Sequence, residues 1–133
     1  MRGRKHPFAD LIGFHITEQR DGYAESAIDV TDIHINVNGV VHGAVVYAMA
    51  DTTMGATLHQ GMADDEICAT IEIKINYYKP VFGGKLTCES TLINRGKRIA
   101  NVEASVYNDG TLVSKANGNF AIFKPGKKAM PAA

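Results

Sequence analysis

One carboxylate, Asp51, lies midway along the stretch HGAVVYAMADTTMGATL, residues 42–58, which contains no other Asp, Glu, Lys or Arg. This stretch predicts a helix that is apolar or small on every side, so its carboxylate is expected to be buried. The hydroxyls of Thr52 or Thr53 could satisfy it as part of the core. A buried carboxylate without a partner is costly, and such groups gather at functional sites. Asp51 is therefore a candidate functional residue.

Two further groups precede the body of this helix. Gly43 follows His42 at the point where the helix should begin, so its backbone N–H points out of the helix N-terminus. A free N–H in that position can stabilise a developing oxyanion. Asn36, in the preceding loop, offers an amide that could orient a water molecule or a carbonyl group. Together these groups indicate chemistry at a carbonyl.

Turn signals and apolar periodicity predict the elements that position these residues. We expect a short helix at 7–12, strands at 13–19 and 23–30, a helix at 43–58, and strands at 67–78, 86–94, 99–108 and 112–123. This order predicts an α+β fold, in which one antiparallel sheet of about five to six strands lies against a central helix.

The strand at 67–78 shows the clearest alternation. Its period of two assigns one face to Ile67, Ala69, Ile71, Ile73, Ile75 and Tyr77, and the other face to Cys68, Thr70, Glu72, Lys74, Asn76 and Tyr78. Tight turns at Arg95-Gly96-Lys97 and Asp109-Gly110 join the three strands that follow.

Composition limits the class of protein. The chain has 133 residues, 45% of them hydrophobic, and 14 Lys+Arg balance 14 Asp+Glu. We expect a single domain over 1–133, with an ordered core at about 7–124 between basic tails. Zero formal charge argues against nucleic acid or an anionic membrane as the main partner. With no visible signal peptide and no apolar run of about 20 residues, a cytoplasmic location is expected.

The two cysteines and the histidines do not predict a metal site. Cys68 and Cys88 match neither a metal spacing nor a disulfide framework, so we expect reduced, buried thiols. No pair of histidines has the spacing of metal ligands.

The helix at 43–58 also predicts an assembly. One sheet can cover only one side of a helix that is apolar all round, so something else must cover the rest. Gly55 lies mid-helix at a cost of about 1 kcal/mol relative to Ala, which close approach of another backbone would explain. Both features suggest a second copy of the chain.

The spaced motif H-x-N-x-x-G-x-x-H-G, from His34 to Gly43, is followed by Asp51 eight positions after its last glycine. This pattern, together with IEIKINYYKP and GGKL, resembles the hotdog-fold acyl-CoA thioesterases of the phenylacetate-degradation type. The likeness covers about 7–123. It implies a hotdog fold, an acyl-CoA substrate, no cofactor apart from the coenzyme A of that substrate, and a homodimer that pairs again into a homotetramer.

The resemblance also implies roles for individual residues. Asn36 and Gly43 would bind the thioester carbonyl or the water, Asp51 would act as general base or nucleophile, and Thr70 would help to hold the water. Ala44 departs from the family pattern, in which a second glycine is common; the N–H of Gly43 remains available.

Several other residues have two interpretations. His42 could donate a hydrogen bond to the substrate or fix its own loop. The basic turn, Arg95, Lys97 and Arg98, could bind the phosphates of coenzyme A or be a solvated hairpin tip. Tyr77 and Tyr78 could each line an acyl pocket or fill the core, and the core is the expected place for Tyr77.

Helix geometry adds a constraint on the site. Eight residues separate Gly43 from Asp51, which is about 12 Å along a helix axis. A thioester carbon must lie within roughly 3 Å of both groups, so one straight helix cannot supply both. An antiparallel partner chain related by a two-fold axis could supply one of them.

Two other functions stay open at this point. One is a hotdog hydratase, which would need an Asp and His acid/base pair. The other is a non-enzymatic acyl-CoA-binding or regulatory module. For the thioesterase, the acyl group could be aryl-acetyl, benzoyl-like or a short to medium fatty acyl chain.

Overall fold

The computed structural model describes residues 6–126. Its elements, in chain order, are α1 (Pro7–Ile12), β1 (Phe14–Arg20), β2 (Tyr23–Asp29), a 3₁₀ turn (Asp32–His34), α2 (Gly43–His59), β3 (Ile67–Tyr77), β4 (Lys85–Arg95), β5 (Ile99–Asn108) and β6 (Thr111–Phe123). Each helix and strand expected from the sequence is present, and its ends lie within one residue of the predicted ends. The expected basic tails lie mostly outside the described residues.

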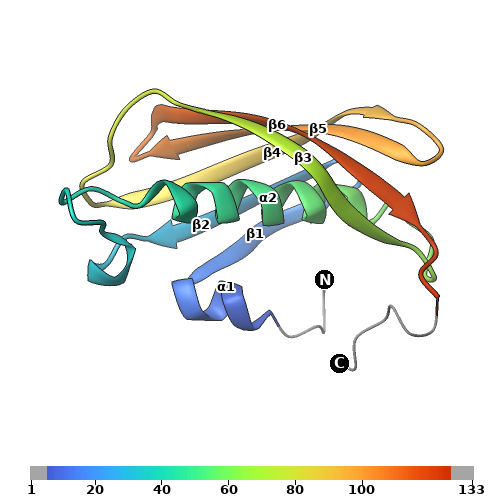
Figure 1. Cartoon of the computed structure of the whole chain (residues 1–133), viewed down its shortest axis with the longest axis horizontal. Coiled ribbons are helices and arrows are strands. Elements are labelled where there is room, and N and C mark those ends of the chain that lie inside the picture. Colours follow the sequence, from blue (N-terminus) through green and yellow to red (C-terminus); the bar gives the residue numbers. More distant parts are fainter. Residues whose placement is uncertain (1–5, 127–133) are drawn as a thin grey trace.

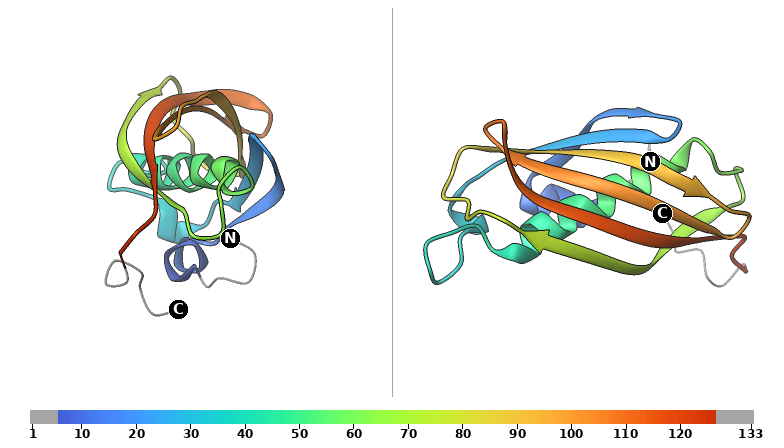
Figure 2. Two further views of the ribbon diagram at one scale, coloured as in Figure 1. Left: turned by 90° about the vertical axis from the view of Figure 1, so that its right-hand side faces the viewer. Right: turned by 90° about the horizontal axis from the view of Figure 1, so that it is seen from above.

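All six strands form one sheet, in the order β1-β2-β4-β5-β6-β3, and every neighbouring pair is antiparallel. The sheet curls around α2, which lies along its concave side (Figures 1 and 2). The short helix α1 lies below α2 in Figure 1, on the side away from the sheet. This arrangement confirms the α+β hotdog fold.

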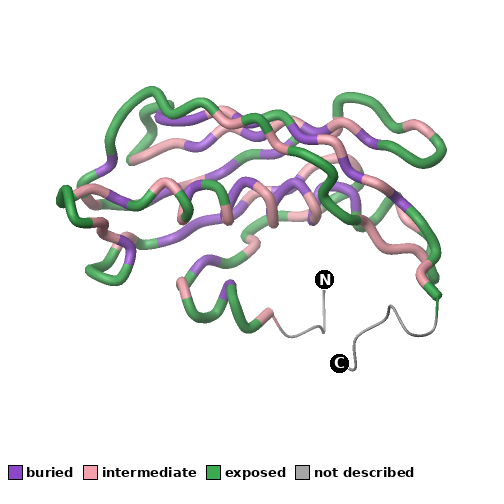
Figure 3. Tube along the Cα trace, in the orientation of Figure 1, coloured by how far each residue is buried: buried purple, intermediate pink, exposed green. Residues whose placement is uncertain are grey.

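α2 packs against the sheet through one side only. Its buried residues are Val46, Met49, Ala50, Thr53, Met54, Ala56, Thr57 and Leu58. Inside this interface the hydroxyls of Ser26 and Thr53 share a hydrogen bond of 2.7 Å, which ties α2 to β2. On the opposite side Tyr47 is 37% exposed, and Asp51 and Gly55 are half-buried (Figure 3). Within one chain the sheet therefore covers only one side of α2, as the sequence predicted, and the opposite side is left uncovered.

β3, the edge strand after α2, contains a β-bulge. Its pairing with β6 shifts register between Thr70 and Glu72, so Ile71 is an extra residue and is 54% exposed. Before the bulge, Thr70 contacts α2; after it, Ile73 and Ile75 pack against the core. The strict alternation expected for this strand is therefore wrong, because the bulge exchanges its two faces.

The loop that leads into α2 is held by His34, which is buried. Its Nδ1 accepts a hydrogen bond from the N–H of Thr31 at 2.8 Å, and its Nε2 donates to the carbonyl of Ile12 at 2.6 Å. The carbonyl of His34 in turn accepts from the N–H of His42 at 2.8 Å. His34 therefore fixes the path of the chain from the end of α1 to the start of α2.

Candidate active site

Asp51 and Thr70 face one another across the contact between α2 and β3. The hydroxyl Oγ1 of Thr70 donates a hydrogen bond to Oδ1 of Asp51 at 2.7 Å. Neither of the two helix hydroxyls suggested as partners is this donor: Thr53 donates to the carbonyl of Met49 at 2.6 Å, and the bond to Asp51 comes from Thr70 rather than Thr52. Within residues 6–126, Oδ2 of Asp51 accepts no hydrogen bond. The carboxylate is thus oriented by one oxygen while the other is available.

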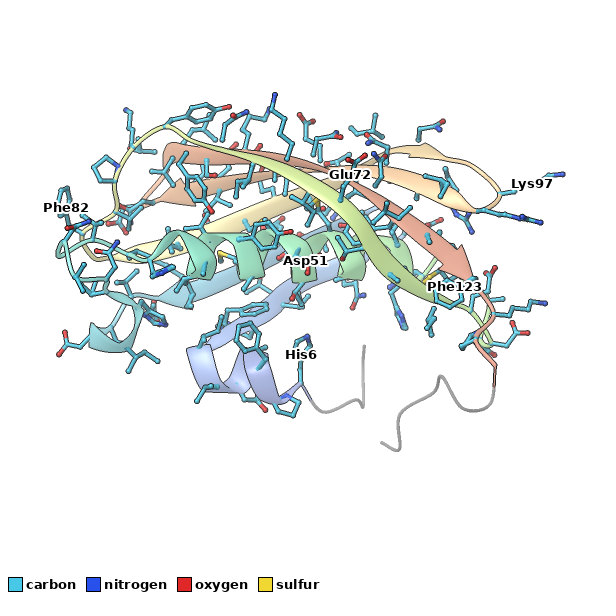
Figure 4. All side chains as sticks on the ribbon, viewed as in Figure 1. His6, Asp51, Glu72, Phe82, Lys97 and Phe123 are labelled. Atoms are coloured by element: carbon cyan, nitrogen blue, oxygen red, sulfur yellow. The ribbon has the colours of Figure 1, made fainter. Side chains whose placement is uncertain are left out.

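The carboxylate opens into a cleft of about 760 Å³. Gly55, Cys68 and Thr70 line this cleft together with Asp51, and so do His6 and His59. Figure 4 shows Asp51 midway along α2, with His6 below it at the start of α1. A methyl group on Gly55 would meet only the Sγ of Cys68, at 3.9 Å, so no close backbone contact within the chain explains this glycine. The cleft therefore leaves room beside the carboxylate for a second molecule.

Cys68 shares this cleft, which the sequence pattern did not reveal. Burial raises the pKa of its thiol above the ordinary value, and the negative charge of Asp51 raises it further. The side chain therefore remains a neutral thiol near neutral pH and is a poor nucleophile. Alternation had placed Cys68 on the same face as Thr70, and both residues precede the bulge at Ile71, in the part of β3 where Thr70 contacts α2.

The start of α2 carries the second half of the predicted site. His42 is the N-cap, and its Nδ1 accepts a hydrogen bond from the N–H of Ala44 at 2.9 Å. The N–H of Gly43, the first residue of the helix, donates to no acceptor in the described part of the chain. An N–H at this position lies at the positive end of the helix dipole. Gly43 can therefore receive an oxygen that develops negative charge.

Asn36 and His42 both shape the loop before α2. The side-chain oxygen of Asn36 accepts from the N–H groups of Asn38 and Val40, at 2.9 and 3.3 Å. These two bonds fix which end of the amide is free, so only its NH₂ can act on another molecule. His42 uses Nδ1 as the helix cap, which supports the loop-fixing interpretation and leaves Nε2 for other contacts.

The two groups of residues lie apart in a single chain. Asp51 and Thr70 line the larger cleft, whereas Gly43 lines a separate pocket of about 350 Å³. α2 runs without interruption from Gly43 to His59, so the two groups stand about two helical turns apart. The structure thus retains the separation that helix geometry predicted.

Tyr77 and Tyr78 line the pocket at Gly43, together with apolar residues. The other lining residues are Val41, Val46, Lys79, Pro80, Val81, Val113 and Ser114. Tyr78 is 52% exposed, as a pocket residue would be. Tyr77 is 50% exposed, so the expectation that it fills the core is wrong. β3 ends at Tyr77, whose hydroxyl reaches the carbonyl of Gly43 at the start of α2.

The basic turn lies at the tip of the β4–β5 hairpin. Arg95, Lys97 and Arg98 are all exposed. The guanidinium of Arg95 folds back onto its own turn and donates to the carbonyls of Gly96 and Lys97. Figure 4 shows Lys97 at one end of the molecule, well away from Asp51. The turn borders neither pocket within one chain.

Three observations bear on the class of site. Cys68 and Cys88 are both unpaired. Cys88 is buried, as expected, and burial raises its pKa to about 12, whereas Cys68 is only half-buried, so the expectation of a buried thiol is wrong there. In the part of the chain that the structure describes, no cluster of three His, Cys, Asp or Glu could hold a metal ion. None of the described helices is long and apolar enough to cross a membrane.

Comparison with known proteins gives a consistent picture. The family model described as Thioesterase superfamily matches residues 38–115. A conserved protein from Pseudomonas aeruginosa is 31% identical, has a TM-score of 0.85, and is matched over 90% of this chain and 95% of its own.

Two further relatives have names that refer to function. A mutant of the phenylacetic acid degradation protein PaaI from Thermus thermophilus is 22% identical with a TM-score of 0.81, over 87% of this chain and 98% of its own, and so shares the fold. The medium/long-chain acyl-CoA thioesterase YigI of Salmonella typhimurium is 20% identical over 132 residues, which cover 87% of this chain and 85% of that protein.

Proposed function

This chain belongs to the thioesterase superfamily, and from that premise we propose that it hydrolyses acyl-CoA thioesters to a free acid and coenzyme A. The observation that carries the proposal is the oriented carboxylate of Asp51, held by Thr70 and open to a cleft. The likeness to an acyl-CoA thioesterase supports coenzyme A as the thiol part of the substrate. No separate cofactor enters the reaction.

The proposed chemistry combines the negatively charged carboxylate of Asp51 with the N–H of Gly43 at the positive end of the helix dipole. Asp51 takes a proton from a water molecule, which attacks the thioester carbon, or attacks that carbon itself to form a mixed anhydride that water then hydrolyses. The N–H of Gly43 donates to the carbonyl oxygen as it becomes an oxyanion, and the coenzyme A thiolate leaves. The free NH₂ of Asn36 assists in binding that oxygen or the water.

Thr70 supports the carboxylate in either route. Its hydrogen bond to Oδ1 fixes the rotation of the carboxylate and leaves Oδ2 for the water or the thioester carbon. His42 contributes by capping α2, which sets the direction of the N–H of Gly43.

We propose that one active site takes Gly43 from one chain and Asp51 from its partner. The separation of about 12 Å along α2 prevents one chain from placing both groups at one carbonyl. A two-fold dimer in which the exposed sides of α2 face each other antiparallel brings them together. The half-buried, mostly uncharged side of α2 around Tyr47 and Gly55 supplies the surface for such a dimer. Dimers pair again into a homotetramer.

The remaining proposed contacts bind the two ends of the substrate. Arg95, Lys97 and Arg98 bind the phosphates of coenzyme A from their hairpin tip. Tyr78 lines the pocket next to Gly43, which is mostly apolar and suits an acyl group. The acyl group is aryl-acetyl, benzoyl-like or a short to medium fatty chain, and a substrate panel decides between them.

The test is release of free thiol from a panel of acyl-CoA thioesters. The wild-type protein should release coenzyme A from at least one of them. Asp51→Asn keeps the shape and removes the basicity, so kcat should fall by at least about a hundredfold while the protein stays folded. Asp29→Asn is the matched control, because Asp29 is exposed on β2 away from both pockets and should leave kcat unchanged.

Other outcomes would point to the alternatives. Binding of acyl-CoA without release of thiol would indicate a non-enzymatic binding module. Addition of water to an enoyl-CoA with the thioester intact would indicate a hydratase.

A further inference from the structure

Tyr77 makes a direct contact with the residue that carries the proposed oxyanion donor. Its hydroxyl Oη donates a hydrogen bond to the carbonyl of Gly43 at 2.7 Å. This bond joins the last residue of β3 to the first residue of α2, over a sequence separation of 34 residues. The edge of the sheet thereby holds the beginning of the helix.

The ring of Tyr77 also lies against Gly43. A methyl group on Gly43 would lie 3.3 Å from both Cζ and Oη of Tyr77, which is tighter than ordinary side-chain packing. Gly43 is not among the glycines with positive φ, so its backbone conformation is open to any residue. A side chain at this position would therefore press against the tyrosine ring.

The first turn of a helix needs such support. Its N–H groups lack partners within the helix, and helix ends fray. An oxyanion donor must be held closely, because a misplacement of about 1 Å can cost about a hundredfold in rate. His42 caps the N–H of Ala44, and Tyr77 restrains Gly43 through its carbonyl and its Cα.

We infer that Tyr77 is a positioning residue, which clamps Gly43 and thereby fixes the direction of the oxyanion donor. The inference rests on the proposed role of Gly43 in thioester hydrolysis. Tyr77 also forms a wall of the pocket at Gly43, so the clamp lies next to the place proposed for the acyl group. Its hydroxyl stays protonated at neutral pH, because burial and the neighbouring Tyr47 raise its pKa above the ordinary value.

Removal of the hydroxyl alone is the first test. Tyr77→Phe should lower kcat by about three- to tenfold, the range expected for one net hydrogen bond, with KM nearly unchanged. Hydrogen exchange at the hydrogen-bonded amides of Ala44 and Val45 should become faster in this variant. Tyr107→Phe is the matched control, because no hydrogen bond of its hydroxyl is present within residues 6–126, and it should change neither quantity.

A double-mutant cycle gives the second test. Gly43→Ala should lower kcat by about ten- to a hundredfold, because the new methyl group displaces the ring or the helix start. In a Tyr77→Leu background the same change should have an effect of less than about twofold, because the obstructing ring is gone. If the losses in kcat from Gly43→Ala and Tyr77→Leu were fully additive, the inference would be overturned. The small size of Gly43 would then serve the approach of the substrate instead.

The exchange measurement separates this inference from the proposed function. If the wild-type protein releases no thiol but exchange at Ala44 and Val45 still rises in Tyr77→Phe, then the function fails and the clamp stands. Unchanged exchange together with unchanged kcat in Tyr77→Phe would overturn the clamp alone. If Tyr77→Leu does not fold, the Tyr77→Phe comparison still decides the question.

Discussion

Thr70 lies on an edge strand and Asp51 on the helix beneath it, yet a 2.7 Å hydrogen bond joins the two side chains. Because the Thr70 hydroxyl donates this bond to a charged acceptor, it stabilises the negative charge of Asp51 and fixes the rotation of the carboxylate group. The free oxygen then faces the cleft without competing hydrogen bonds from the described residues. This relationship defines what each substitution at the two positions should do.

Removal of the Thr70 hydroxyl should lower kcat without abolishing it. Thr70→Val keeps the shape, and we expect kcat to fall by about tenfold, the loss of one hydrogen bond to a charged group. Thr70→Ser keeps the donor and should stay within about threefold of wild type. Steady-state kinetics with the best substrate of the acyl-CoA panel gives both values. Equal losses in the Ser and Val variants would show that the methyl group, not the hydroxyl, matters.

Complementation between two inactive chains should test the shared site. Asp51→Asn and Gly43→Pro should each be nearly inactive alone, since proline at the first helical position preserves the helix but lacks the N–H. A purified heterodimer should regain about half of the wild-type activity, because one of its two sites combines the intact Gly43 and Asp51. Two different affinity tags allow the heterodimer to be isolated.

Two checks accompany this experiment. Circular dichroism must show that Gly43→Pro folds, because the proline ring lies close to Tyr77. Light scattering should show a dimer or a tetramer of the wild-type protein at micromolar concentration. An inactive, verified heterodimer would mean that both groups act within one chain, and a monodisperse monomer would rule out the dimer built on α2.

Substitution of the basic turn should weaken substrate binding and leave the chemical step intact. With Arg95, Lys97 and Arg98 all replaced by Ala, KM for acyl-CoA should rise by about tenfold, equivalent to about 1.4 kcal/mol, and kcat should stay nearly constant. In wild type, KM should rise with ionic strength, and the triple variant should lose most of that dependence. Lys115→Ala is a control, because Lys115 pairs with Glu103 at 3.2 Å, away from the turn. A salt dependence that survives in the triple variant would place the phosphates elsewhere.

The thiol of Cys68 should report the charge on Asp51. Burial, followed by the Asp51 carboxylate, raises the Cys68 pKa above 9.0, so alkylation by iodoacetamide should be slow at pH 8 and its rate should still be rising with pH beyond pH 9. Asp51→Asn removes the negative charge and should lower that pKa, so the variant should react faster at pH 8.5. Mass spectrometry of the Cys68 peptide measures the rate, with Asp29→Asn as the control. Identical rates in wild type and Asp51→Asn would contradict the electrostatic coupling.

The same shift has a consequence for stability. A group with a raised folded-state pKa contributes stability that is present below its unfolded value and is lost as the pH rises through its folded value. For Cys68 and Cys88 the loss therefore begins above about pH 9, the ordinary cysteine value. Denaturant titrations at pH 8 and pH 10 should show a lower free energy of unfolding at the higher pH.

Local patterns were sufficient to predict the elements of this fold. Asp109 and Gly110 both have positive φ, which is what the Asp-Gly turn signal predicts. The helix beginning at Gly43 follows from the apolar run and from its capping residue His42. These features depend on neighbours in sequence, so sequence reasoning can identify them. The same kind of local pattern indicated Asp51, midway along the helix, and Gly43, at its start, as candidate functional residues.

What the sequence did not predict depends on contacts between distant segments. Nothing in ATIEIK indicates that Ile71 is an extra residue, because a bulge is decided by how β3 pairs with β6. The exposure of Tyr77 and its contact with Gly43 likewise require knowledge of where β3 ends beside α2. Periodicity alone assigned this tyrosine to the core, since it cannot show where the covering sheet stops.

The bulge at Ile71 gives β3 two independent halves. The half before the bulge supplies the hydroxyl for the carboxylate, while the half after it supplies core packing and the tyrosine at Gly43. A substitution in one half of β3 does not change the direction in which the side chains of the other half point. Deletion of Ile71, in contrast, would rotate Thr70 away from the helix. The strand can therefore accept changes at its Thr70 end and at its Tyr77 end separately, so the lining of the pocket at Gly43 can change while the Asp51 carboxylate keeps its partner.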